Sequence, residues 1–171
     1  MRHDPLADPR PLIKRVYAYV AYRIGDGADA EDVTSATFER ALRYRSSFDP
    51  SRGDAVSWLI GISRRCIADA MQGRETPTDD LPEARGDDHQ ELVLNRLDLR
   101  DAVGRLDDRD RELIALRFGA DLSARQIAEI LELKTNAVEV ALHRALARLR
   151  HTLEPDDASS PELVLKPKAS P

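Results

Sequence analysis

The stretch SARQIAEILELKTNAVEVALHRALARLR, residues 123–150, decides how the C-terminal half of this chain is interpreted. Ser123 is a favoured N-cap residue, and Gln126 three positions later completes a capping box. These two residues predict the start of a short helix. Its apolar residues recur at helical spacing and form one stripe, made of Ile127, Ile130 and Leu131.

A second, longer helix is expected directly after this one. Residues 132–134 form the turn between the two helices, and Thr135 is expected to cap the second. The buried stripe of the second helix is predicted at Val138, Leu142, Ala145 and Leu149. This pattern is the helix-turn-helix plan: a short helix, a three-residue turn and a longer helix with polar outer positions. In that plan the second helix enters a DNA major groove. A plain helical hairpin has the same pattern and stays open as the alternative.

Length and composition limit the class of protein. The chain has 171 residues, of which 33% are charged and 5% aromatic, so we expect an all-α protein with one domain or two small ones. No apolar run approaches the length of a membrane span, and the N-terminus MRHDPLADPR lacks the apolar segment of a secretory signal. The single cysteine, Cys66, excludes an internal disulfide framework. We therefore expect a cytoplasmic protein with no membrane insertion.

No constellation of catalytic residues is visible. The histidines at 3, 89, 143 and 151 are scattered and lack the spacing of metal ligands. The sequence has no glycine-rich phosphate loop and no serine nucleophile elbow. We expect no enzymatic activity, no metal and no cofactor.

The chain divides into two small helical domains. The first is predicted at 10–75, with helices near 10–22, from Asp29 and at 55–71, and the second at 92–152. Residues 76–91 are acidic and are predicted to be a flexible linker, and residues 153–171 a disordered tail. Each domain is near the lower size limit for an independent core, so each is expected to be steadied by a partner surface. In the helix from Asp29 we expect four residues to point inward, namely Val33, Phe38, Ala41 and Leu42.

The net charge is −5, which is unusual for a protein that binds DNA. The second domain is neutral overall, and only its last stretch is basic. Because phosphate neutralisation drives affinity for duplex DNA, the chain alone should bind DNA weakly. A partner that supplies further contacts would remove this difficulty.

The third helix of the first domain carries a second candidate feature. In WLIGISRRCIADAMQGR, residues 58–74, Arg64 and Arg65 lie beside the apolar stripe, and Phe48 and Trp58 flank the loop before the helix. Aromatic side chains next to a basic helix can stack on the unpaired bases of single-stranded DNA. Phe48 and Trp58 can equally be core residues, and the pattern alone leaves both readings open.

These segments carry a family resemblance. DAEDVTSATFERAL (29–42), followed by F-D-P…W-L-x-x-I-x-R…D (48–69), resembles region 2 of bacterial RNA polymerase sigma factors. The stretch LDDRDRELIALRFGADLSARQIAEILELKTNAVEVALHRALARLR (106–150) resembles their region 4. The presence of these two regions joined by a linker is similar to the small extracytoplasmic-function class. The resemblance covers about residues 10–151.

The resemblance implies a subunit that directs promoter recognition and transcription initiation. Its implied partners are core RNA polymerase, through the β′ clamp and the β flap, and promoter DNA, with an anti-sigma protein as a further candidate. The implied contacts with core polymerase are Asp29, Glu31, Asp32, Ser35 and Arg40. Those with the promoter −10 element are Phe48, Arg52, Trp58, Arg64 and Arg65. Those with the −35 element are Lys134, Thr135, Asn136, Glu139, His143, Arg144 and Arg148.

One departure from the family pattern affects the −35 contacts. The chain has Glu139-Val140-Ala141 where the family commonly has Lys-Ser-Arg. Recognition of the −35 element is therefore expected to rest on Asn136, His143 and Arg144, with Lys134 and Arg148 on phosphates. Two other functions stay open: an autonomous helix-turn-helix regulator that binds an operator as a dimer, and a sigma-like interaction module that does not read DNA.

Overall fold

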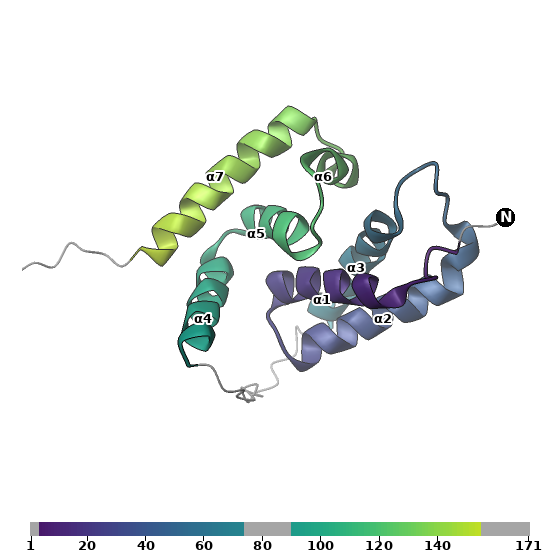
Figure 1. Ribbon diagram of the computed structural model, residues 1–171, viewed down its shortest axis with the longest axis horizontal. Helices are drawn as coiled ribbons and strands as arrows, with labels where there is room; N and C mark the ends of the chain where they lie inside the picture. Colours follow the sequence, from purple (N-terminus) through teal and green to yellow (C-terminus); the bar gives the residue numbers. More distant parts are fainter. Residues whose placement is uncertain (1–3, 74–89, 155–171) are drawn as a thin grey trace, which may run out of the picture.

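The computed structural model describes residues 4–73 and 90–154, with the side chains of residues 90–97 left out of the description (Figure 1). Within these ranges the chain forms helices and no strand, which confirms the predicted all-α class. The predicted flexible linker at 76–91 and disordered tail at 153–171 lie almost entirely outside the described residues.

The first block contains three helices, α1 (Pro9–Ile24), α2 (Ala28–Tyr44) and α3 (Ala55–Gln72), with a short 3-10 turn η1 (Arg45–Ser47) after α2. Proline at the first position of α1 is compatible with a helix start. Gly25 and Gly27 have φ angles of 92° and 116°, which side-chain-bearing residues rarely adopt, and so the chain turns between α1 and α2 at these glycines. The side chain of Asp54 caps α3 by accepting a hydrogen bond from the backbone N–H of Ser57.

The inward faces of α1, α2 and α3 form the core of this block. Val33 and Ala41 are buried on α2 as predicted, and Phe38 is partly buried. The prediction for Leu42 is wrong, because its side chain is 57% exposed. Ala41 occupies the inward position, and Leu42 lies about 100° further around the helix.

The second block contains α4 (Gln90–Arg105), α5 (Asp108–Ile114), a π-helical turn η2 (Ala115–Gly119), α6 (Ala124–Leu131) and α7 (Thr135–Leu153). The predicted capping box of α6 is present between Ser123 and Gln126. Glu132 then turns the chain in the left-handed conformation at φ 55°. The predicted cap of α7 is wrong, since Lys134 is at the N-cap position and Thr135 is the first helical residue. Helices α6 and α7 nevertheless form the predicted helix-turn-helix.

The predicted apolar stripe of α7 is buried. Its side chains pack against α5, α6 and the end of α4, which leaves the opposite face of α7 exposed to solvent. The residues of the stripe are Val138, Leu142, Ala145 and Leu149.

The two blocks lie side by side and share one hydrophobic core (Figure 1). Helix α1 packs on η2, where Gly119 touches the backbone of α1 so closely that an added Cβ would lie 2.8 Å from the Cα atom of Tyr19. Arg15 donates hydrogen bonds to the carbonyl oxygens of Ala120 and Asp121, at 2.7 and 2.8 Å. The surface that covers each small block is therefore the other block.

Candidate nucleic-acid interface

The loop between α2 and α3 is held in shape by its own polar residues. The carboxylate of Asp49 accepts hydrogen bonds from the backbone N–H and the hydroxyl of Ser51, and these bonds hold the pKa of Asp49 below its ordinary value. The backbone N–H of Arg52 bonds to the carbonyl of Asp49 at 3.0 Å. This turn leaves the side chain of Arg52 exposed beside the start of α3.

Phe48 and Trp58 are in contact with each other. Their ring centroids lie 5.4 Å apart with the planes inclined at 60°, and each side chain is partly exposed. Neither ring is among the fully buried side chains. Both rings line a cavity of about 480 Å³, and so they keep surface available for contact with a ligand.

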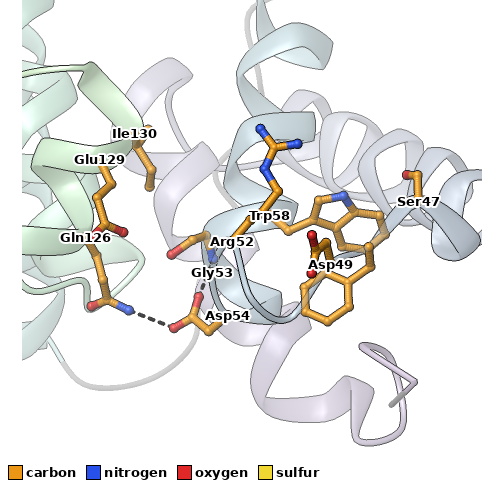
Figure 2. A pocket seen from close by; sticks show the side chains of 11 residues that line it. Ser47, Asp49, Arg52, Gly53, Asp54, Trp58, Gln126, Glu129 and Ile130 are labelled. Atoms are coloured by element: carbon orange, nitrogen blue, oxygen red, sulfur yellow. Dashed lines mark hydrogen bonds between the residues drawn. The ribbon is translucent and has the colours of Figure 1, made fainter. Parts of the chain in front are cut away.

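This cavity lies between the loop of the first block and helix α6 of the second (Figure 2). Its α6 side is lined by Gln126, Glu129 and Ile130. The side-chain amide of Gln126 donates to the carboxylate of Asp54 at 2.7 Å, as the dashed line in Figure 2 shows. Since Asp54 caps α3 and Gln126 completes the capping box of α6, one hydrogen bond joins the starts of two helices in different blocks.

Arg64 forms an ion pair with the second block. Its Nε lies 3.1 Å from a carboxylate oxygen of Glu112, and its side chain is 42% exposed. Glu112 also accepts from the hydroxyl of Tyr19 at 3.0 Å and pairs with Arg23 at 2.5 Å. Arg23 in turn donates to Asp108 at 2.8 Å and thereby lowers the pKa of that carboxyl. Arg65, the next residue of α3, is exposed.

Burial and charge both act on Tyr19. Burial raises the pKa of its hydroxyl well above the ordinary value, and the negative charge of Glu112 raises it further. A buried carboxylate is stabilised only when it is paired and hydrogen-bonded, and Glu112 obtains its partners from α1 and α3 of the other block.

Glu112, Gln126 and Asp54 were not predicted from the sequence as site residues. The position of a carboxylate within the apolar run ELIAL was the available sign of a buried ion pair at Glu112.

The residues expected to contact core polymerase lie on α2. Glu31, Asp32 and Ser35 are exposed, as is Asp29 at the start of the helix. Arg40 forms a 2.7 Å ion pair with Asp69 of α3, and this hydrogen bond raises the pKa of the guanidinium. The first turns of α2 therefore present a mainly acidic surface.

The residues expected to contact the −35 element lie on or before α7. Asn136, Glu139, His143 and Arg144 are exposed on its outer side, Lys134 is exposed at the N-cap, and Thr135 is half-buried. Arg148 donates to the buried carboxylate of Asp110 at 2.5 Å, which leaves it less free for phosphate. Val140, which is not among the expected contacts, has a side chain that is 51% exposed on the same outer side.

The described residues contain no group of three or more histidine, cysteine, aspartate or glutamate side chains placed to hold a metal ion. Among the same residues, none of the helices is both long enough and apolar enough to cross a membrane.

Both blocks match models of known protein families. Residues 10–76 match the model of sigma-70 region 2, and residues 96–149 match that of sigma-70 region 4. The chain is 36% identical over 152 residues to the ECF RNA polymerase sigma factor BldN of Streptomyces coelicolor, a match that covers 84% of this chain and 57% of BldN. It is 33% identical over 136 residues to the RNA polymerase sigma-E factor of Streptomyces antibioticus, with 78% of this chain and 76% of that protein covered.

A solved structure shows the same fold. The sigma factor RpoE of Bartonella quintana, in complex with the anti-sigma factor NepR, superposes with a TM-score of 0.70 at 21% identity. The superposition covers 85% of this chain and 94% of that chain.

Proposed function

Because this chain belongs to the sigma-70 family of RNA polymerase sigma factors, in its extracytoplasmic-function class, we propose that it directs core polymerase to promoter DNA. In this proposal α2 binds the β′ clamp, the second block binds the β flap, the loop before α3 engages the −10 element, and α7 engages the −35 element. The chain works in the cytoplasm without chemistry of its own and without a cofactor, because core polymerase carries the catalytic site. An anti-sigma protein is a further partner in the proposal.

The observation that carries the −10 assignment is the cavity beside Phe48 and Trp58. Phe48, Arg52 and Trp58 lie on the side of this cavity that the first block forms, opposite the wall formed by α6. Two aromatic rings line it, and base–aromatic stacking contributes about 1–3 kcal/mol per base. Arg52, which also lines the cavity, adds a cation for the neighbouring phosphates. A base that leaves the duplex during promoter opening finds a stacking surface and a positive charge in one place.

The contacts between the two blocks limit the access of DNA to α3. Asp54 and Arg64 are bonded to the second block, and α6 forms one wall of the cavity. Single-stranded DNA therefore gains full access to α3 only when the two blocks move apart. We infer that the packed arrangement is a closed form and that binding to core polymerase favours an open form. Opening separates Glu112 from Tyr19, Arg23 and Arg64, so these contacts belong to the closed form alone.

Transcription with purified core enzyme tests the proposal. Promoters are first selected from a random library by the wild-type holoenzyme, and run-off transcription and permanganate reactivity of thymines near −10 are then measured. Phe48→Ala should reduce thymine reactivity more than it reduces promoter binding, because unstacked bases exist only in the open complex. Phe118→Ala is the matched control, since this phenylalanine is 50% exposed and does not line the cavity.

Three results would count against the proposal. Equal thymine reactivity in the Phe48 and Phe118 variants would remove the cavity from promoter opening. Tight, specific duplex binding by the free chain would favour an autonomous regulator. Failure of the holoenzyme to start transcription at any selected promoter would favour an interaction module.

A further inference from the structure

The outer face of α7 has an apolar centre. The helix buries the stripe from Val138 to Leu149, and at 3.6 residues per turn Val140 lies almost opposite that stripe. Its side chain is 51% exposed and lies between the polar side chains that flank it along the helix. Ala147, two turns further on, is also exposed at the centre of this face. A groove that receives this face of α7 therefore has Val140 near its centre.

The position of Val140 along α7 is that of a base reader. In helix-turn-helix proteins the N-terminal residues of the second helix contact base edges. Val140 is in the second turn of α7, one turn after Asn136 and one turn before Arg144. It belongs to neither hydrophobic core cluster and caps no helix end, so burial does not explain its place there.

The chemistry of the major groove supplies a matching partner. The C5-methyl group of thymine is the one apolar group among the base edges exposed there, and aliphatic side chains contact it. Asn136 can bond adenine with both atoms of its amide, whereas the carboxylate of Glu139 faces only acceptors on a guanine edge. Asn136 therefore favours an A·T base pair, whereas Glu139 disfavours guanine and can accept a hydrogen bond from a base donor such as cytosine N4.

We propose that Val140 is a specificity-determining residue that reads the C5-methyl group of a thymine in the −35 element. This inference rests on the proposed function and deepens it. Burial of one methyl group corresponds to about a fourfold change in affinity. Specificity at one base pair thus comes from an aliphatic contact, on a helix that lacks the arginine expected at position 141.

Replacement of thymine by deoxyuridine removes this methyl group and nothing else. The affinity of holoenzyme is measured for a selected promoter in which each −35 thymine is replaced in turn. Wild-type holoenzyme should lose about fourfold at one of these positions. Val140→Ala should show a smaller deoxyuridine penalty than wild type at that position, because it lacks the two terminal methyl groups of valine. Leu153→Ala, which removes an exposed apolar side chain from the last turn of the same helix, should keep the wild-type difference.

The proposal is overturned if Val140→Ala shows the same deoxyuridine penalty as wild type, or if no −35 thymine carries a penalty in wild type. Unchanged promoter affinity of Val140→Ala would overturn it as well. If wild-type holoenzyme does not bind the unmodified promoter specifically, the proposed function itself fails. That result is distinguished from the others before any deoxyuridine is introduced.

Discussion

Gly119→Ala is the substitution for which the structure gives the sharpest expectation. The added Cβ would lie 2.8 Å from both the Cα and N atoms of Tyr19, and 3.0 Å from the carbonyl carbon of Ala18. Ordinary contacts of a Cβ begin at 3.4 Å, so α1 and η2 must move apart by 0.6 Å or more. The neighbouring atoms are backbone atoms of a buried helix and cannot turn aside as a side chain can.

The expected cost follows from this geometry. Overpacking a well-packed core typically costs about 1–3 kcal/mol, and the strain here falls on the contact between the two blocks. Gly104→Ala is the matched control, because Gly104 is helical and its added Cβ meets nothing within 4 Å. There alanine should stabilise the chain by up to about 1 kcal/mol through its higher helix propensity. The two substitutions therefore have opposite predicted signs.

Chemical denaturation of both variants measures this difference. The unfolding free energy of Gly119→Ala should fall, and its radius of gyration from small-angle X-ray scattering should rise as the blocks separate. If Gly119→Ala is as stable as Gly104→Ala and equally compact, α1 does not pack closely on η2 at Gly119.

Three further predictions concern charge. The pKa of Tyr19 is raised by burial and by Glu112, so the folded state keeps a proton that the unfolded chain loses above pH 10. The unfolding free energy of the wild type should therefore fall above pH 10 by about 1.4 kcal/mol per pH unit. Denaturation curves in a pH series measure this fall, which Tyr19→Phe should lack. Asp32→Arg should weaken binding to core polymerase by about 1–3 kcal/mol in a titration, whereas Glu39→Arg on the same helix, outside the predicted contacts, should not. Glu139→Lys should raise promoter affinity for all −35 sequences and steepen its salt dependence by about one unit, and an unchanged salt slope would place α7 away from DNA.

Local features of the fold were predictable from the sequence because they depend on residues close together in the chain. Ser123 and Gln126 form the predicted capping box, since both partners lie within one helical turn. The stripe of α7 is buried as expected because a period of 3.6 residues determines which side chains share a face. Leu42 was misplaced because two adjacent apolar residues, Ala41 and Leu42, cannot both point inward, and periodicity alone did not show which one does.

Contacts between the blocks could not be predicted in this way. The bond from Gln126 to Asp54 joins residues 72 positions apart, and that from Tyr19 to Glu112 joins residues 93 positions apart. No spacing rule relates such pairs. Arg64 illustrates the consequence: the sequence indicated a DNA contact, and the structure shows its guanidinium paired with Glu112. Both statements hold if the blocks separate when the chain acts.

Separation of the blocks is the central claim, and a reversible crosslink tests it most directly. Arg23 and Asp108 form an ion pair between α1 and α5 and are not among the predicted contacts with DNA or core polymerase. Cysteines at these two positions can be joined by a short reducible crosslinker, since the native Cys66 is buried. The account predicts that the crosslinked chain supports no run-off transcription with core polymerase and that reduction restores it. Equal transcription before and after reduction would contradict the claim.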